Sequence, residues 1–350
     1  MKAITVEPKK TGTARYMEMP EPDMRDGSIL VEAVAVGVCG TDVEIMEGKY
    51  GWAPPGQQHL ILGHESLGRV IDPGTSTGFK KGDLVVGIVR RPDPVPCPNC
   101  AVGEWDMCKN GQYTERGIKE IHGYMSERWR IEPEYAIKID PSLGILGVLL
   151  EPTTVVTKAL EQIGIISRRS FWEPNKVLVT GAGPIGLLAA LSLKIWGVQE
   201  IHVLDRMESG SKPDLVRELG AIYHSGNISD IGFEPDAIVE CTGVGPVIEA
   251  SIKQLGPNGI LCLTGVGHGG HMTTAGTADM AASAVLRNTV IVGSVNANKR
   301  QWFRAGQTLA KADKKWLAKL ITRREKPENF MKALERQPYD IKVVIQFSEI

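Results

Sequence analysis

The sequence has no excess of charge of either sign, few aromatic residues and no long hydrophobic run. Its 350 residues include 40 basic and 41 acidic side chains, which leave a net charge of −1. This balance argues against nucleic acid or an anionic membrane as the main partner. No stretch is long and apolar enough to predict a membrane span, and the N-terminal segment 1–7 lacks the apolar core of a signal peptide.

Cysteine is also scarce. There are six cysteines in the chain, and three of them lie between positions 97 and 108. Clustered cysteines in a chain of this length suit metal ligands in a reducing compartment better than a disulfide framework. We therefore expect a cytoplasmic protein.

A glycine-rich turn organises the second half of the sequence. The apolar segment 176–180 predicts a buried strand, and segment 187–193 predicts a helix behind the turn. In this context the pattern GxGxxG is the dinucleotide fingerprint, in which backbone N–H groups at the helix N-terminus hold the pyrophosphate. The residues expected to contact the cofactor are Gly181, Gly183, Pro184, Ile185 and Gly186.

The next strand candidate, segment 200–204, ends at Asp205, which lies 19 residues beyond Gly186. A carboxylate at this place can accept hydrogen bonds from the adenosine ribose hydroxyls of NAD, and it would repel the additional phosphate of NADP. Arg206 follows and can reach a phosphate or stack on adenine. We therefore expect NAD to be the preferred cofactor and NADP to be usable.

The pattern of apolar residues divides the chain into two domains. Residues 1 to about 90 predict short strands with glycine and proline punctuation, which is typical of a small barrel. Residues 169–296 alternate strands and helices, which predicts a doubly wound parallel sheet. The last 50 residues predict helices over 302–312 and 316–324 and a strand over 341–347. We expect one domain over 1–168 and 297–350 and another over 169–296.

Two sequence segments of the first domain carry metal-ligating side chains. Cys39 follows the strand candidate that ends at Val36, and His64 follows some 20 residues later in Gly63-His64-Glu65. A thiolate and an imidazole at neighbouring strand ends can bind one zinc, with a carboxylate as a third ligand and one position left open. Each residue alone would more often be a buried structural side chain, but together they predict a catalytic zinc site.

These motifs and the fingerprint downstream resemble the zinc-dependent medium-chain dehydrogenase/reductase superfamily over essentially the whole chain. Within it, the sequence is most similar to the archaeal-type glucose dehydrogenases. The segments that carry this similarity are 62–65, 89–92, 113–117, 122–125 and 293–296. The resemblance implies an α/β protein with a GroES-like β-barrel catalytic domain and a doubly wound parallel-sheet Rossmann domain.

The resemblance also implies roles for individual residues. The catalytic zinc would be held by Cys39, His64, Glu65 and Glu151. Thr41 would hydrogen-bond the reacting oxygen of the sugar, so that Thr41, Glu65 and Glu151 form the catalytic group. The sugar hydroxyls would contact Thr41, Glu115, Glu151 and Asn296, and Asn296 would also contact the cofactor. Taken alone, Glu151 could instead be an ordinary acid at a helix N-terminus, and Glu115 and Asn296 could be polar loop residues.

The three clustered cysteines, Cys97, Cys100 and Cys108, resemble the structural zinc loop of the same superfamily, which uses four cysteines. The position of the first cysteine is occupied here by Pro94, which cannot bind metal, and Asp93 is the nearest oxygen donor. The loop either holds a structural zinc with a substituted ligand or is free of metal. The clustering favours zinc.

The sequence therefore predicts an oxidoreductase that oxidises an aldose of the glucose or galactose type at C1 to the aldonolactone, with Zn²⁺ and NAD(P). One alternative is a zinc-dependent polyol or secondary-alcohol dehydrogenase. Another, of a different class, is a catalytically silent nucleotide-binding protein. By resemblance, the chain is expected to form a homodimer or homotetramer through the Rossmann sheet edge near residues 290–295. We expect a small sugar as substrate.

Overall fold

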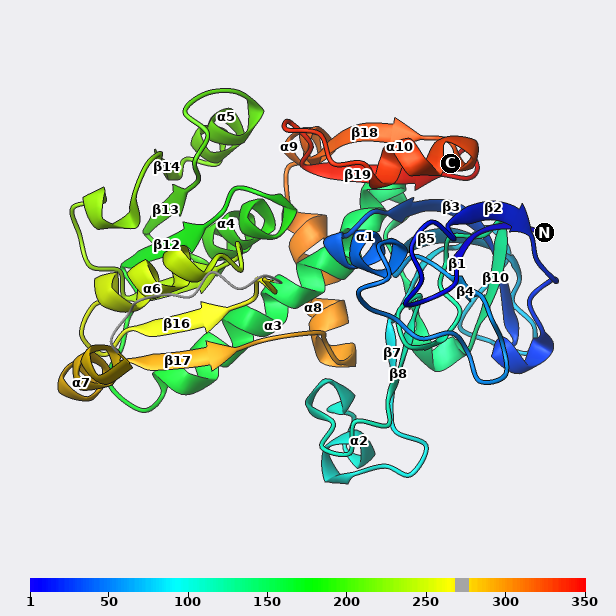
Figure 1. Ribbon diagram of the computed structural model, residues 1–350, viewed down its shortest axis with the longest axis horizontal. Helices are drawn as coiled ribbons and strands as arrows, with labels where there is room; N and C mark the ends of the chain where they lie inside the picture. Colours follow the sequence, from blue (N-terminus) through cyan, green and yellow to red (C-terminus); the bar gives the residue numbers. More distant parts are fainter. Residues whose placement is uncertain (268–276) are drawn as a thin grey trace. The chain divides into compact units, whose positions relative to one another are not determined.

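The computed structural model describes residues 1–267 and 277–350 of the chain (Figure 1). They form two compact units, one of residues 1–151 and 297–350 and the other of residues 152–296. The sequence predicts the first boundary at position 168, whereas the second unit begins at Pro152. It lies earlier because helix α3 (Leu150–Ser167) belongs to the second unit from its third residue onward.

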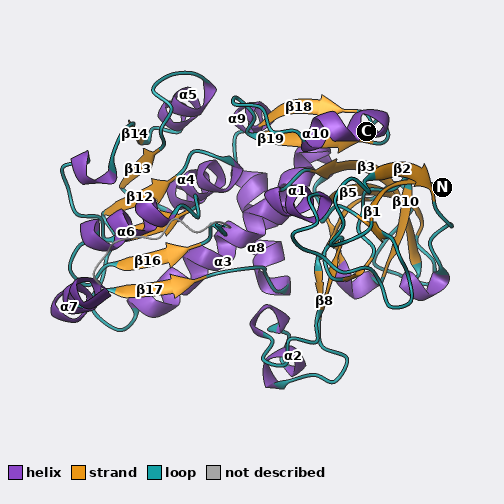
Figure 2. Ribbon diagram, viewed as in Figure 1, coloured by secondary structure: helices purple, strands orange, loops and turns teal. Residues whose placement is uncertain are grey.

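The first unit is built mainly of antiparallel strands, as the sequence indicated (Figure 2). Its largest sheet has the order β11-β6-β5-β3-β19-β18, and β10 also pairs with β3. Two smaller sheets have the orders β2-β1-β4 and β7-β8-β9. The strands are β1 (Lys2–Val6), β2 (Arg15–Glu18), β3 (Ile29–Gly37), β4 (Leu60–Ile61), β5 (Glu65–Asp72), β6 (Leu84–Gly87), β7 (Arg90–Arg91), β8 (Thr114–Arg116), β9 (Glu120–Ile121), β10 (Arg128–Ile131), β11 (Ala136–Lys138), β18 (Ile321–Glu325) and β19 (Lys342–Gln346).

Short helices connect these strands. The α-helices of the first unit are α1 (Gly40–Met46), α2 (Pro98–Ala101), α8 (Lys299–Lys311), α9 (Lys314–Leu320) and α10 (Phe330–Leu334). The 3₁₀ turns are η1 (Met24–Asp26), η2 (Trp105–Met107), η3 (Pro133–Tyr135), η4 (Pro141–Leu149) and η6 (Pro327–Asn329). The helix predicted over 316–324 is wrong in its second half. Residues 321–325 form β18, whose backbone pairs in parallel with β19, and this long-range pairing outweighs local helical spacing.

The second unit contains a six-stranded, fully parallel sheet with the order β14-β13-β12-β15-β16-β17. Its strands are β12 (Lys176–Thr180), β13 (Glu200–Leu204), β14 (Ile222–His224), β15 (Ala237–Glu240), β16 (Ile260–Leu263) and β17 (Val290–Gly293). Its helices are α3, α4 (Pro184–Trp196), α5 (Ser211–Glu218), η5 (Ile228–Asp230), α6 (Gly245–Gln254) and α7 (Thr277–Arg287). The expected doubly wound sheet is present.

The core of this sheet explains its apolar strands. Leu178, Ile238 and Leu261 come from three adjacent strands and are completely buried in one hydrophobic cluster. Strands of a parallel sheet covered by helices on both faces need apolar residues on both sides. Because the strands are parallel, their carboxyl ends all lie at one edge of the sheet, where the glycine-rich turn also lies.

The segment Pro141–Ser167, which combines η4 and α3, has the length and composition of a membrane-spanning helix, with a mean hydropathy of 1.4. However, 78% of its most apolar window is buried inside the protein. Burial of this extent is typical of a core helix, so this segment gives no reason to place the chain in a membrane.

Candidate active site

The first candidate metal ligand, Cys39, lies where β3 leads into α1. Its backbone N–H donates to the carboxylate of Asp42 at 2.9 Å, which stabilises the start of the helix. The Thr41 hydroxyl lies 3.9 Å from the Cys39 sulfur. The turn therefore presents a thiol and a hydroxyl next to each other.

His64 and Glu65 lie at the start of the neighbouring strand, β5. Glu65 pairs with Gly37 in the ladder between β3 and β5. A Cβ at position 37 would lie only 2.0 Å from Glu65 Oε2, so the missing side chain of Gly37 leaves the space that the carboxylate fills. The register of two antiparallel strands thus brings Glu65 to the strand end beside Cys39.

The structure brings Cys39, His64 and Glu65 together. One ligand atom from each residue can be chosen so that all three lie within 4.8 Å of one another, and His64 and Glu65 are buried. His64 Nδ1 and Asp42 Oδ1 are 3.4 Å apart and are buried without a regular hydrogen bond. A partly buried thiol together with a buried imidazole and carboxylate, with an unsatisfied ring nitrogen, fits a divalent transition metal such as zinc.

The electrostatic surroundings of His64 also favour a cation. Burial alone would disfavour a charged imidazole, but the carboxylate of Asp42 outweighs it and raises the pKa of His64 well above the ordinary value. A site whose negative charges stabilise a buried proton on an imidazole provides the same stabilisation to a metal cation. Asp42 was not identified from the sequence, although its position three residues after Cys39 was a possible signal.

Lys342 was also missed. Its ammonium group, on β19, donates to both carboxylate oxygens of Glu65, at 2.7 and 2.6 Å, and to the carbonyl oxygen of Val38 at 3.0 Å. Burial disfavours this charge, yet the adjacent Glu65 raises the pKa of Lys342. In this structure Glu65 is thus the partner of a buried lysine, and its role as a zinc ligand stays a prediction.

Glu151 lies in the first turn of α3, as expected from its sequence position. Burial raises the pKa of Glu151 to about 7; the charge of His64 opposes this shift and the charge of Glu65 adds to it. These electrostatic effects indicate that Glu151 lies near the metal-ligand cluster, although it is not one of the three residues that meet within 4.8 Å. Its role as a ligand stays a prediction.

The predicted sugar contact Glu115 is buried in an ion pair. Arg90 on β7 and Glu115 on β8 are paired across the two strands, and the guanidinium donates to Glu115 Oε1 at 3.0 and 3.1 Å. Arg90 also lies over the ring of Tyr113 at 3.7 Å. Arg90 is a further residue that sequence reasoning did not single out, and it holds Glu115 in one orientation.

The three clustered cysteines form a second group of possible metal ligands. The sulfur atoms of Cys97, Cys100 and Cys108 lie within 4.8 Å of one another around α2 and η2. Backbone N–H groups of Lys109 and Cys100 lower the pKa of Cys97 to about 6, which favours the thiolate that binds metal.

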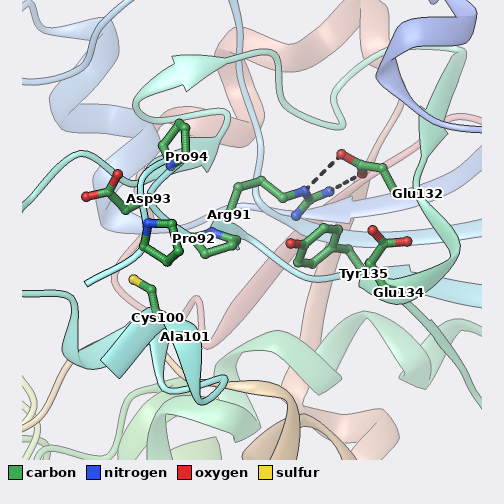
Figure 3. Close-up of a pocket in the computed structure, with 10 residues that line it drawn as sticks. Arg91, Pro92, Asp93, Pro94, Cys100, Ala101, Glu132, Glu134 and Tyr135 are labelled. Atoms are coloured by element: carbon green, nitrogen blue, oxygen red, sulfur yellow. Dashed lines mark hydrogen bonds and ion pairs between the residues drawn. The ribbon is translucent and has the colours of Figure 1, made fainter. Parts of the chain in front are cut away.

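Asp93, the expected fourth donor, lies beside this group. Its side chain is buried, Oδ1 accepts from the backbone N–H of Val95 at 2.8 Å, and Oδ2 is buried without a hydrogen-bond partner. Figure 3 shows Asp93 and Cys100 at one side of a cavity of about 610 Å³. At the other side Arg91 binds Glu132 at 2.9 Å. The carboxylate of Asp93 is not among the atoms that meet within 4.8 Å, and its role as a ligand stays a prediction.

The dinucleotide fingerprint adopts the geometry that its glycines predict. Gly181 has a φ of +89°, which permits the tight turn after β12. A Cβ on Gly186 would lie 1.7 Å from the Gly181 carbonyl oxygen, whereas a Cβ on Gly183 would meet open space. Gly186 is therefore required for packing of α4 against the turn, and Gly183 leaves the turn open to a ligand.

Asp205 is fixed beside this turn. Its Oδ2 accepts from the backbone N–H of Ala182 at 2.6 Å, and its Oδ1 accepts from that of Met207 at 3.3 Å. Arg206 is exposed. Asn296 has a left-handed backbone with φ of 60° and ends the second unit. The structure thus brings Asp205 to the fingerprint, as expected, while the roles of Arg206 and Asn296 stay predictions.

Comparison with known proteins gives the same two-part organisation. Residues 25–141 match the family described as "Alcohol dehydrogenase GroES-like domain", and residues 144–347 match the family described as "Glucose dehydrogenase C-terminus". The chain is 38% identical to glucose 1-dehydrogenase 2 of Vulcanisaeta moutnovskia over 352 residues, and 36% identical to glucose 1-dehydrogenase of Methanocella arvoryzae over 356 residues. Both alignments cover 99% of each chain.

The structure is similar to that of Haloferax mediterranei glucose dehydrogenase in complex with NADP, Zn and gluconolactone. The two superimpose with a TM-score of 0.91 at 33% sequence identity, and the alignment covers 100% of both chains. The similarity therefore includes both compact units and every segment that carries a candidate ligand or cofactor contact.

Proposed function

Because this chain belongs to the zinc-dependent medium-chain dehydrogenase/reductase superfamily, and within it to the glucose 1-dehydrogenases, we propose that it oxidises an aldose of the glucose type at C1 to the aldonolactone. The hydride passes to NAD(P). The observation that carries this proposal is the cluster of Cys39 with the buried His64 and Glu65 in a chain whose second unit has a complete dinucleotide fingerprint.

Zinc, when bound, acts as a Lewis acid that lowers the pKa of the sugar hydroxyl. Cys39 and His64 hold the metal, and Asp42 fixes the imidazole ring, since its carboxylate lies 3.4 Å from His64 Nδ1. Thr41, whose hydroxyl is 3.9 Å from the Cys39 sulfur, accepts the hydrogen bond of the C1 hydroxyl and starts removal of its proton. Glu65, whose charge Lys342 balances, and Glu151 are the carboxylates proposed at the same site.

The sugar is positioned by hydrogen bonds that its hydroxyls donate to Glu115 and Glu151 and form with Asn296. Glu115 suits this role because Arg90 fixes its carboxylate in a buried position, and a fixed group recognises a hydroxyl at little entropic cost. A sugar that lacks the matching hydroxyl loses its hydrogen bond to this buried carboxylate, which reduces its reactivity.

We propose that NAD is the preferred cofactor and that NADP is usable. The support for NAD is Asp205, whose carboxylate lies against the fingerprint turn through Ala182, where it disfavours a ribose phosphate. The Haloferax relative was solved with NADP, and the exposed Arg206 offers this chain a cation for that phosphate.

The thiols of Cys97, Cys100 and Cys108 are proposed to hold a second, structural zinc.

We also propose that the chain is a homodimer or homotetramer through β17, because Ile291 on this edge strand and Leu286 on α7 are exposed, the latter by 81%. All six cysteines are free thiols, which supports a cytoplasmic location.

The proposal is tested by metal analysis together with a cofactor-reduction assay on a panel of aldoses, open-chain polyols and secondary alcohols. We expect zinc in the protein and NAD(P)H formation with an aldose, with the lactone as product. Activity on polyols with little on aldoses would favour a polyol dehydrogenase. Binding of NAD without turnover of any substrate would favour a nucleotide-binding protein that lacks catalysis.

A further inference from the structure

A completely buried carboxylate lies at the point where the strand order of the parallel sheet reverses. Glu240 is the last residue of β15, has an exposed fraction of 0%, and pairs in register with Thr180, the last residue of β12. β12 and β15 are neighbours in the sheet, and the chain continues from them in opposite directions. Dinucleotides bind across the carboxyl ends of the strands at such a reversal.

The side chain of Glu240 is surrounded by hydrogen-bond donors. Its Oε1 accepts from the hydroxyl of Thr180 at 3.2 Å, the backbone N–H of Thr242 at 2.7 Å and the Thr242 hydroxyl. The backbone N–H of Gly243 donates to both oxygens, at 3.2 and 3.1 Å. Thr242 Oγ1 itself accepts from the Val244 N–H at 3.0 Å, so its hydrogen is directed to Glu240. Backbone N–H groups cannot accept a hydrogen bond, so this environment fits an ionised carboxylate.

The backbone of Glu240 orders the next loop along the sheet edge. Its carbonyl oxygen accepts from the N–H and the hydroxyl of Thr264, at 2.9 and 2.7 Å, and from the N–H of Gly265 at 3.1 Å. The loops after β15 and β16 are in direct backbone contact, because a Cβ on Gly265 would lie 2.2 Å from the nitrogen of Gly243. One buried residue therefore fixes two adjacent loops and places a negative charge beneath them.

We propose that Glu240 favours binding of the oxidised cofactor over the reduced one, because its buried negative charge stabilises the positively charged nicotinamide ring of NAD(P)⁺. Asp205 and the fingerprint turn place the adenosine half over β12 and β13, which leaves the β15 to β17 half for the nicotinamide nucleotide. The inference rests on the proposed function, since it requires a nicotinamide dinucleotide as ligand.

The charge of the cofactor's pyrophosphate is the same in the oxidised and reduced forms. Repulsion between it and Glu240 therefore cancels when the two forms are compared, and only the ring, cationic in NAD(P)⁺ and neutral in NAD(P)H, distinguishes them. In a site shielded from water such an interaction extends over several ångströms. For an enzyme that works in the direction of sugar oxidation, this discrimination reduces inhibition by its own reduced cofactor.

The test is to measure dissociation constants of the full-length protein for NAD⁺, NADH and ADP-ribose, which lacks the nicotinamide, and in parallel for NADP⁺ and NADPH. In Glu240→Gln, we expect the ratio of the constants for oxidised and reduced cofactor to rise about threefold to tenfold. A tenfold rise corresponds to a change of about 30 mV in the potential of the bound two-electron couple. In the same variant, the ratio of the dissociation constants for NADH and ADP-ribose should change by less than about twofold.

Two variants separate charge from structure. Glu240→Asp keeps the charge but shortens the side chain, and Thr180→Val removes one hydrogen bond and keeps the charge. Both should leave the ratio of oxidised to reduced cofactor within about twofold of wild type, even where all three affinities fall. Circular dichroism and thermal unfolding check that each variant is folded.

An increase in the ratio in Glu240→Asp, or a parallel loss of affinity for all three ligands in Glu240→Gln, would show that Glu240 only supports the loops and would overturn the inference. If the Gln variant does not fold, a raised ratio in the Asp or Val variant still overturns the inference. If the wild-type protein binds none of the dinucleotides, the proposed function itself fails, which is a different result from an unchanged ratio.

Discussion

The ammonium group of Lys342 contacts both carboxylate oxygens of Glu65, at 2.7 and 2.6 Å, and the two side chains are each only 3% exposed. The residues are 277 positions apart in the chain. A buried charge without its partner is strongly unfavourable, whereas the complete pair contributes little net stability. The pair therefore neutralises a carboxylate that lies beside the two candidate zinc ligands Cys39 and His64.

Replacement of Lys342 by Met should destabilise the metal-free protein by about 3–5 kcal/mol, because it leaves the Glu65 carboxylate buried without a counter-charge. The double variant Glu65→Gln with Lys342→Met should recover much of this loss. Urea unfolding in the presence of a chelator gives the free energies of unfolding of wild type, Lys342→Met, Glu65→Gln and the double variant. These four values form a double-mutant cycle. Additive effects of the two substitutions would contradict the pairing.

Removal of Cys39 tests the catalytic metal site separately from the cofactor site. Cys39→Ala should abolish turnover and lower the zinc content, while the affinity for NAD should stay nearly unchanged because the fingerprint is in the other compact unit. Zinc analysis, the steady-state kcat and cofactor titration check this. Retention of most of the kcat would mean that Cys39 is not a zinc ligand.

The cysteine loop should affect stability more than catalysis. Cys100→Ser should reduce the zinc content by about one ion per chain and lower the melting temperature, because structural zinc contributes folding free energy. The value of kcat/KM for the sugar should fall less. Asp93→Asn is the matched variant for the fourth position, and a loss of zinc in it would identify the carboxylate as a ligand. A Cys100→Ser protein with normal stability and zinc but no activity would reverse the assignment.

The choice of cofactor should respond to Asp205. Asp205→Ser should raise kcat/KM with NADP relative to NAD, since it removes a negative charge from the ribose site, and Met207→Arg should extend this change by adding a cation. Asp205→Asn is the matched control, because it removes the charge and keeps the size of the side chain. Measurements use one fixed sugar. A wild-type enzyme that clearly favours NADP would show that Arg206 dominates the site.

A histidine pair on β13 and β14 should make stability depend on pH. His202 Nδ1 lies 2.7 Å from His224 Nε2, and His202 Nε2 lies 2.8 Å from Glu200. Lys176, which also approaches Glu200 at 3.6 Å, is the other charged group here. Burial lowers the pKa of both histidines, so the unfolded chain binds more protons below about pH 6.5 and stability falls as the pH falls.

His224→Gln should reduce this pH dependence, by at most about 1.4 kcal/mol per pH unit. Burial also lowers the pKa of His122, to about 4, and this group adds an effect of the same sign. The measurement is therefore the difference in free energy of unfolding between wild type and variant from pH 7 to pH 5. An identical pH dependence in the two proteins would contradict the effect of the pair.

The sequence predicted those parts of the fold and site that depend on local patterns. The turn at Gly181, the strand before it and the acid at position 205 lie close together in the chain, and their spacing reflects the geometry of a single βαβ unit. Cys39 and His64 were recognised because Cys39 follows one strand and His64 directly precedes the strand beside it. The three cysteines between 97 and 108 were recognised by spacing, and the structure brings their sulfur atoms together.

What was missed depends on pairing between distant segments. Lys342 is one charge in a short apolar strand, and only the antiparallel pairing of β19 with β3 brings it to the metal-ligand cluster. Arg90 similarly meets Glu115 through pairing of β7 with β8. The strand at 321–325 was mistaken for helix because its parallel pairing with β19 is not apparent from local spacing. Register between non-neighbouring strands is not encoded in periodicity.

Gly37 shows that a residue without functional groups can be as necessary to a metal site as its ligands. A methyl group there would occupy the place of Glu65 Oε2, so Gly37→Ala would force the carboxylate away from both Lys342 and the neighbouring His64. A search for reactive side chains alone would pass over this position. Any transfer of this candidate metal site into another β-barrel would have to include the empty space opposite the glutamate together with the candidate ligands.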